Sequence, residues 1–284
     1  MILIATGVLI ASFIAVGGIF CAATLHVPRR TGTKPEAAAI VNLSATDGAQ
    51  LSAWWFRSPI PTHRCVLILH GIADSRVGSA GFAPLFLTAG YNVLTPDSRG
   101  HGTSGGEYVT YGLLEKHDVI AWAEWMKRAG CVRTFALGES LGATILIQAA
   151  AIRPEFSAIV AECPFADLRD IARYRVEHSI GSAPGAAVIA ALVVESGFAY
   201  ARWIDGLDFG EVSPVEAMAR IRTPVLLIHG LSDSQTPPSH SQRLARANPA
   251  SVLWLVPNAG HTGAAAAAPQ QFRTRVLDWF AQER

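Results

Sequence analysis

Charged residues are scarce in this sequence. Lys, Arg, Asp and Glu make up 16% of its 284 residues, and the formal net charge is +1. No run rich in Lys and Arg occurs, so nothing indicates a nucleic-acid partner. Half of the residues are hydrophobic, which excludes a disordered chain and favours an enzyme with a buried sheet or a protein with a membrane segment.

Cysteine is also rare. The four cysteines are far apart and show no Cys-x-x-Cys spacing; they are Cys21, Cys65, Cys131 and Cys163. Neither a disulfide framework nor a zinc site is indicated, and we expect four buried free thiols and no metal. A Gly-x-Gly-x-x-Gly match at 100–105 is not followed by a clear helix, so we expect no dinucleotide cofactor.

The first 28 residues contain no Lys, Arg, Asp or Glu, and they are almost entirely apolar. About 20 such residues cross a bilayer as a helix. A cleaved signal peptide would have a positive start, which is missing here, and a lipoprotein signal would have small residues where Ile19 and Phe20 precede Cys21. We therefore favour a single-pass transmembrane anchor at 1–28 over a signal segment or a soluble core helix.

Positive charge follows the apolar segment directly. Arg29, Arg30 and Lys34 lie in the stretch 29–38, which reads as a linker. Positive residues flank membrane helices on the cytoplasmic side, so they favour the cytoplasm for the following domain, residues 39–284, but three charges leave the orientation open.

Strand-like and helix-like stretches alternate through that domain. Runs at 39–45 and 50–57 flank an Asp-Gly turn and predict an antiparallel hairpin. Six short apolar runs are typical of strands buried on both faces, and helix-period segments separate most of them. The pattern predicts an α/β fold with a mostly parallel, doubly wound sheet and helices on both faces. The expected strands are 65–69, 91–94, 134–137, 158–161, 225–228 and 252–256, with helices at 113–127, 141–151 and 272–280.

One region interrupts this alternation. No strand is evident at about 164–214, which is rich in Ala and aromatic residues and too long for a simple connection. We expect it to form a helical cap over the edge of the sheet.

The clearest chemical motif is Gly-Glu-Ser-Leu-Gly at 138–142. It follows a predicted strand and opens a predicted helix, the context of a nucleophile elbow. Ser140 would project from a tight turn, and both glycines would avoid collisions with the neighbouring strand and helix. The helix N-terminus favours the negative charge that develops there.

A serine nucleophile needs a base, and the usual chain order in such sites is Ser, then acid, then His. His261 lies in the loop after the last predicted strand and is a better candidate than His240. Asp233 follows the preceding strand and would orient that imidazole. Asp205 and Asp208, in the cap, are weaker candidates for the acid.

An oxyanion hole needs two backbone N–H donors. The residue after the nucleophile, Leu141, supplies one, and Ile72, after an early strand, fits the other. We expect His70 to be structural, and Asp97 and Arg99 to hold loops together by charged hydrogen bonds.

Together these motifs resemble the α/β-hydrolase superfamily, most closely its membrane-anchored, serine-aminopeptidase-like and esterase-like branch. The resemblance covers about 38–282 and rests on motifs in the family's order: His-Gly at 70–71, the loop at 97–104, the elbow at 138–142, His-Gly-x-x-Asp at 229–233 and Gly-His at 260–261. It implies an α/β-hydrolase fold and acyl transfer without metal or cofactor, with Ser140, His261 and Asp233 as the triad.

The sequence leaves the substrate open. The favoured hypothesis is a serine hydrolase that cleaves an ester of a small or lipid-like acyl group. Alternatives are an amidase or aminopeptidase, whose amine-binding acid could be Glu195, Asp205 or Asp208, and an acyltransferase. A non-catalytic binding protein of the same fold is a fourth possibility.

Overall fold

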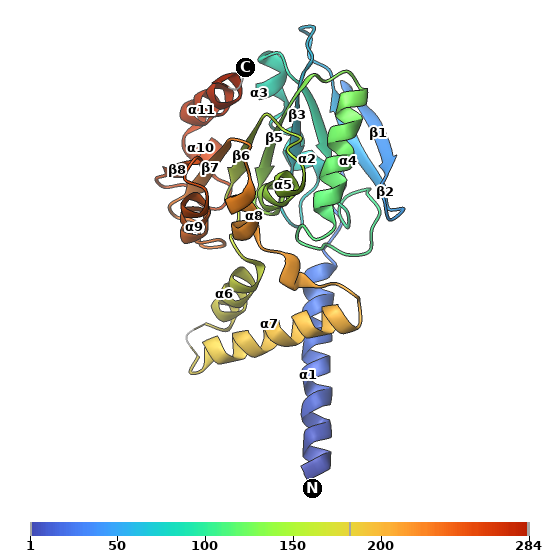
Figure 1. The fold of residues 1–284 in the computed structure, drawn as a ribbon, viewed down its shortest axis with the longest axis vertical. Coiled ribbons are helices and arrows are strands. Elements are labelled where there is room, and N and C mark those ends of the chain that lie inside the picture. Colours follow the sequence, from blue (N-terminus) through green and yellow to red (C-terminus); the bar gives the residue numbers. More distant parts are fainter. Residues whose placement is uncertain (1, 182, 283–284) are drawn as a thin grey trace.

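The computed structural model describes residues 2–181 and 183–282, with side chains described from residue 11 onward. One mixed sheet of eight strands forms its centre, in the order β1-β2-β4-β3-β5-β6-β7-β8 (Figure 1). The first three neighbouring strands pair antiparallel and the rest pair parallel. The strands are β1 Ala38–Ser44, β2 Gln50–Phe56, β3 Arg64–Leu69, β4 Asn92–Pro96, β5 Arg133–Glu139, β6 Ala158–Glu162, β7 Val225–Gly230 and β8 Val252–Val256.

The predicted hairpin and the α/β-hydrolase fold are confirmed. β1 and β2 pair along their whole length around the turn that contains Asp47 and Gly48. Gly48 has a φ of 88°, a left-handed conformation that glycine adopts readily. All six apolar runs are strands of the parallel part, shifted by no more than two residues at either end.

Helices cover both faces of the sheet. Alternate residues of each strand point to opposite sides, so the buried strands present apolar side chains to helices on both faces. On β3, Leu67 packs toward α4 and α5, whereas Val66 and Ile68 pack toward α3 and α11. The two apolar layers lie on opposite faces of the same strands. The helices of this domain are α2 Arg76–Ala80, α3 Ala83–Thr88, α4 Glu115–Arg128, α5 Leu141–Ile152, α8 Pro214–Arg220, α9 Ser239–Ala247, α10 Ala264–Ala267 and α11 Pro269–Gln282.

Between β6 and α8 the chain leaves the sheet. The segment forms α6 (Leu168–Ile180), α7 (Ala186–Trp203) and the short 3-10 helix η1 (Phe209–Glu211). These three helices fall in the region where the sequence predicts a cap, and we refer to them as the cap; α6 and α7 lie on one side of the sheet in Figure 1.

The N-terminal helix α1 (Ile2–Leu25) extends away from the body, and α7 crosses it (Figure 1). At the crossing the backbones are close. A Cβ on Gly17 would lie 2.4 Å from the Ser196 carbonyl oxygen, and one on Gly197 would lie 2.2 Å from Phe20 Cδ1. The C-terminal half of α1 therefore packs against the cap, which the apolar composition of 1–28 does not predict.

Membrane insertion of α1 stays a prediction. Within the described residues, one helix is long and apolar enough to cross a bilayer by length and composition, and it is α7, with 39% of its length buried. The part of α1 with described side chains, Ala11–Leu25, is too short to meet that criterion.

The segment predicted as a linker is packed against the domain. The Arg29 guanidinium donates hydrogen bonds to the carbonyl oxygens of Ser104 and Gly106. The Lys34 ammonium donates to the carbonyl of Ala38, the first residue of β1. These contacts fix the path from α1 to the sheet.

The expectation of four free thiols is wrong. Cys65 and Cys131 form a disulfide, with their Cα atoms 5.9 Å apart, although 66 residues separate them in sequence. The reason is strand order: β5 lies beside β3, so the residue that leads into β5 meets the start of β3. Cys21 and Cys163 are buried free thiols, as expected.

Candidate active site

Ser140 occupies the turn between β5 and α5. Its backbone is strained, with φ 52° and ψ −113°, and the surrounding packing holds it there. A Cβ on Gly138 would lie 2.5 Å from the Ala143 nitrogen, and one on Gly142 would lie 2.5 Å from the Leu69 carbonyl oxygen. Both positions therefore require glycine, for the steric reason that the motif predicts.

The strand order places this turn at a topological switch point. β4 lies on one side of β3 and β5 on the other, so the chain reverses its direction of winding there. Ligands of open α/β sheets bind where the carboxyl ends of strands diverge in this way. Ser140 and the loop after β3 meet at that place.

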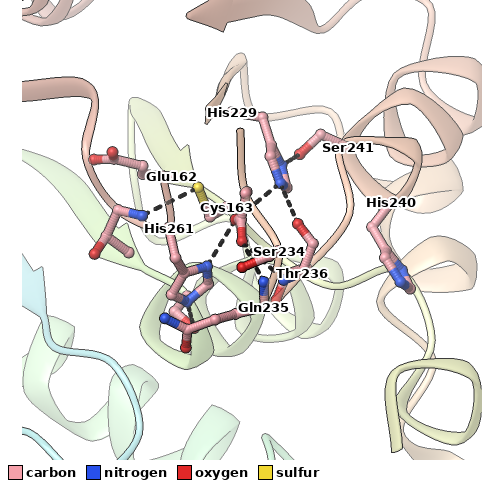
Figure 2. Close-up of polar contacts among 12 residues, drawn as sticks. Glu162, Cys163, His229, Ser234, Gln235, Thr236, His240, Ser241 and His261 are labelled. Carbon is pink, nitrogen blue, oxygen red and sulfur yellow. Dashed lines mark hydrogen bonds and ion pairs between the residues drawn. The ribbon is translucent and has the colours of Figure 1, made fainter. Parts of the chain in front are cut away.

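The three residues predicted as a triad lie in hydrogen-bonding contact. Ser140 Oγ is 2.8 Å from His261 Nε2, and His261 Nδ1 is 2.7 Å from Asp233 Oδ2. Because the carboxylate accepts at Nδ1, that nitrogen carries the hydrogen, and Nε2 is free to accept from the serine hydroxyl. Figure 2 shows His261 with these hydrogen bonds drawn as dashed lines.

Asp233 is held as an anion. Burial opposes its charge, but hydrogen bonds from His229, His261 and the Thr236 amide outweigh that effect and hold the pKa of Asp233 well below its usual range. Its Oδ1 accepts from the backbone N–H groups of Gln235 and Thr236, at 2.9 Å each. The carboxylate can therefore orient His261 and stabilise its cation.

His229 is a partner of Asp233 that the sequence motifs did not predict. Its Nε2 is 2.7 Å from the Thr236 carbonyl and 3.2 Å from Asp233 Oδ2, and its Nδ1 is 2.6 Å from Ser241 Oγ (Figure 2). The carbonyl can only accept, so Nε2 donates and Nδ1 accepts from the hydroxyl. The sequence contained a signal for this contact: His229 stands at the end of a predicted strand, four residues before Asp233.

A small pocket of about 160 Å³ opens over the serine. Its walls include Ile72 from the loop after β3, and its edge carries Asp74 and Glu139. Leu141 begins α5 directly after Ser140, so its N–H belongs to the first turn of that helix. Ile72 thus lines the pocket that contains Ser140 and Leu141 follows the serine, and their role as the two oxyanion donors stays a prediction.

Two carboxyl groups, half-buried Glu139 and buried Glu162, lie next to one another beside the nucleophile. Glu139 and Glu162 are register partners on β5 and β6. Burial, followed by the nearby charges of Glu162 and Asp74, raises the pKa of Glu139 to about 8. Burial likewise raises the pKa of Glu162 to about 7, and Glu162 Oε1 accepts from the Ala264 N–H. Glu139 occupies the variable position before the serine in the Gly-x-Ser-x-Gly motif. Its raised pKa keeps it largely protonated at neutral pH.

The neighbouring loops are held by the residues expected to be structural. His70 accepts a hydrogen bond from the Ser98 N–H at 3.0 Å. Arg99 donates two hydrogen bonds to Asp118, at 2.6 and 2.7 Å, and pairs with Asp47. Asp97 accepts from the Arg76 N–H, so all three side chains brace the loop after β4.

The weaker candidates lie elsewhere. His240 is buried and accepts from the Ala166 N–H, so it does not reach Ser140. Glu195 is paired with Arg169 and Arg173, and Asp208 pairs with Arg202 and caps η1. Asp205 follows the end of α7 in the cap.

One cluster has the residue types of a metal site. Ligand atoms of Cys163, His229 and Asp233 lie within 4.8 Å of one another. However, both nitrogens of His229 and both oxygens of Asp233 have protein partners, and Cys163 Sγ accepts from the Thr262 N–H. These groups serve as a hydrogen-bonding support for His261, and they do not fit a metal ion.

Comparison with known proteins gives a consistent result. Residues 79–283 match the model of the prolyl oligopeptidase family. The uncharacterized protein YqkD of Bacillus subtilis is 30% identical over 285 residues, covering 92% of this chain and 90% of its own.

Two further proteins have named activities. The lysophosphatidylserine lipase ABHD12 of Danio rerio is 28% identical over 200 residues, covering 66% of this chain and 48% of its own. The structure of the Pyrococcus furiosus esterase Pf2001 superposes with a TM-score of 0.72 at 25% identity, covering 91% of this chain and 97% of its own.

Proposed function

The chain belongs to the prolyl oligopeptidase family, and we propose that this serine hydrolase cleaves carboxylic esters through an acyl-enzyme on Ser140. The observation that carries the proposal is the unbroken chain of hydrogen bonds from Ser140 through His261 to Asp233. Similarity to the esterase Pf2001 and to the lysophosphatidylserine lipase supports an ester bond as the target.

The proposed mechanism gives each of these residues a role. His261 Nε2 takes the hydroxyl proton as Ser140 Oγ attacks the carbonyl carbon. The N–H groups of Leu141 and Ile72 stabilise the tetrahedral oxyanion. His261 then protonates the leaving alcohol, and the same imidazole activates the water that releases the acid.

The test uses the full chain with p-nitrophenyl esters of increasing acyl length and a fluorophosphonate probe. Ser140→Ala should lose covalent labelling, and its turnover should fall on the order of 10⁴-fold or more. Ser232→Ala is the matched control, because Ser232 is an exposed serine beside Asp233, and it should keep both. Labelling or turnover that survives in Ser140→Ala would refute the assignment.

An amidase or aminopeptidase is the second candidate, favoured by Asp74 at the edge of the catalytic pocket. Asp74 lines that pocket, whereas Glu195, Asp205 and Asp208 do not, so Asp74 is the acid best placed to bind a substrate ammonium. Faster turnover of an aminoacyl p-nitroanilide than of the matched ester, lost selectively in Asp74→Asn, would favour this candidate over the esterase.

We further propose that α1 anchors the chain in a bilayer as a single-pass helix. It has 24 residues and no charged side chain, and it extends away from the body (Figure 1). Retention of the full chain in carbonate-washed membranes, and release when residues 1–28 are removed, would support insertion. Release of the full chain by carbonate would contradict it.

Two features favour opposite sides for the catalytic domain. Arg29, Arg30 and Lys34 favour the cytoplasm, whereas the Cys65–Cys131 disulfide favours an oxidising compartment. We propose the oxidising side, because three charges are a weaker constraint than a covalent bond between two buried cysteines. Digestion of the domain by protease added to intact cells is the expected result, and complete protection would restore the cytoplasmic assignment.

A further inference from the structure

A second and larger cavity lies away from the catalytic pocket, where α1 meets the cap. Its volume is about 380 Å³, within the range of pockets that hold small molecules. Phe20 and Leu25 of α1, Ile171 and Val176 of α6, Phe198 of α7 and Phe209 of η1 line it. In Figure 1, α7 runs from beside α6 to its crossing with α1.

This cavity and the pocket over Ser140 share no lining residue. The cavity is also built into the fold. Tyr111, on its wall, donates a hydrogen bond from its hydroxyl to the Thr24 carbonyl of α1 at 2.8 Å. The Gly197–Phe20 contact closes α7 onto α1 at the same place.

One positive charge stands in this apolar wall. Among the described residues that line the cavity, Arg175 alone is charged. Arg169 and Arg173, on the same helix, both pair with Glu195. In the described part of the chain no carboxylate lies within ion-pair distance of Arg175, so its guanidinium has five donors available to an anion.

The two helices also expose apolar side chains elsewhere. Ile14 and Ile19 of α1, and Val188, Ile189 and Leu192 of α7, are exposed to solvent. Exposed apolar side chains of this kind are typical of surfaces that contact lipid. The helices that form the cavity are therefore suited to meet ligands that partition into lipid.

We propose that this cavity binds a long-chain fatty acid, with the hydrocarbon chain between α1, α6 and α7 and the carboxylate on Arg175. The apolar wall accounts for the chain, and the unpaired guanidinium accounts for the anionic head. The site does not depend on Ser140 chemistry, so it stands or falls independently of the proposed esterase activity.

The test measures binding of cis-parinaric acid, a fluorescent fatty acid, to the full chain in lipid nanodiscs. The background is Ser140→Ala, so that no turnover interferes. We expect saturable binding that palmitate displaces and that hexadecyltrimethylammonium, a cation with the same chain length, does not. Equal displacement by the cation, or stronger displacement by a lysophospholipid of equal chain length, would overturn the fatty-acid assignment.

Three variants locate the site. Arg175→Gln should weaken binding about tenfold or more, because a charge-assisted contact is lost. Ala172→Phe fills the cavity and should abolish binding, and Arg175→Gln still tests the site if that crowded variant does not fold. Arg246→Gln, which alters an exposed arginine on α9, is the control and should leave binding unchanged. Unchanged binding in Arg175→Gln would overturn the proposal.

Discussion

His229 and His261 share a single oxygen of Asp233: the Oδ2 atom lies 3.2 Å from His229 Nε2 and 2.7 Å from His261 Nδ1. His261 is the proposed base, and His229 is fully buried beside Asp233. We therefore expect His229 to be a positioning residue, which keeps the carboxylate in place for the ring that contacts Ser140.

The first prediction concerns that position. His229→Phe retains a ring but removes the donor to Asp233, and kcat should fall about 10- to 100-fold with KM little changed. Ser241→Ala is the control, because it removes the hydrogen bond on the other side of the imidazole and leaves the Asp233 contact intact. Steady-state kinetics on a p-nitrophenyl ester measures kcat and KM of both variants. An equal fall in kcat in the two variants would mean that His229 has only a structural role.

The second prediction concerns the elbow. Gly142→Ala places a Cβ 2.5 Å from the Leu69 carbonyl oxygen, and overpacking of this kind should lower the free energy of unfolding by about 1–3 kcal/mol or more. Gly260→Ala is the comparison, since nothing lies within 4 Å of its added Cβ. Denaturant unfolding monitored by circular dichroism measures both, and equal stability of the two variants would contradict the steric argument.

The third prediction concerns the disulfide. Cys65→Ser with Cys131→Ser should lower the free energy of unfolding by roughly 2–5 kcal/mol, because the bond closes a loop of many residues. In the unreduced, denatured wild-type chain, two of the four cysteines should react with an alkylating agent. Mass spectrometry gives the number of cysteines that are alkylated. Four reactive thiols would show that the bond does not form.

The fourth prediction concerns pH. The folded-state pKa of Glu139 is raised to about 8 from an ordinary value of 4.5, so folding favours its protonated form. The contribution of protonated Glu139 to the free energy of unfolding is fully present below about pH 4.5. It is lost as the pH rises toward 8 and Glu139 ionises in the folded state. Glu139→Gln should flatten this decline in the free energy of unfolding, and Glu162 should maintain a smaller decline over a lower range.

The measurement is denaturant unfolding at several pH values for wild type and Glu139→Gln. Glu177→Gln is the control, because Glu177 is exposed on α6. A slope in Glu139→Gln as steep as in wild type would assign the pH dependence to other groups.

The sheet could be predicted because its strands are short apolar runs between helix-period segments. The relation of Ser140, Asp233 and His261 could also be predicted, since each follows a strand whose carboxyl end lies at the same edge. These signals are local in the sequence. The three residues come close together because the strands that precede them are parallel and end at the same edge of the sheet.

The features that escaped prediction depend on which elements become neighbours. The Cys65–Cys131 bond requires β3 beside β5, and the cavity requires α1 folded against α7. Neither relationship leaves a periodic pattern in the sequence. His229 was missed for a different reason: its role depends on which oxygen of Asp233 it approaches, and spacing alone does not give that.

The close crossing at Gly17 and Gly197 has a consequence for the cavity beside it. A side chain at Gly17 would meet the Ser196 carbonyl oxygen, and one at Gly197 would meet the Phe20 ring, so a larger residue at either position would force α1 and α7 apart. Because Phe20 and Gly197 both line the cavity, the distance between the two helices sets its width. The glycines of the elbow and those of the crossing therefore shape two different pockets of the same chain.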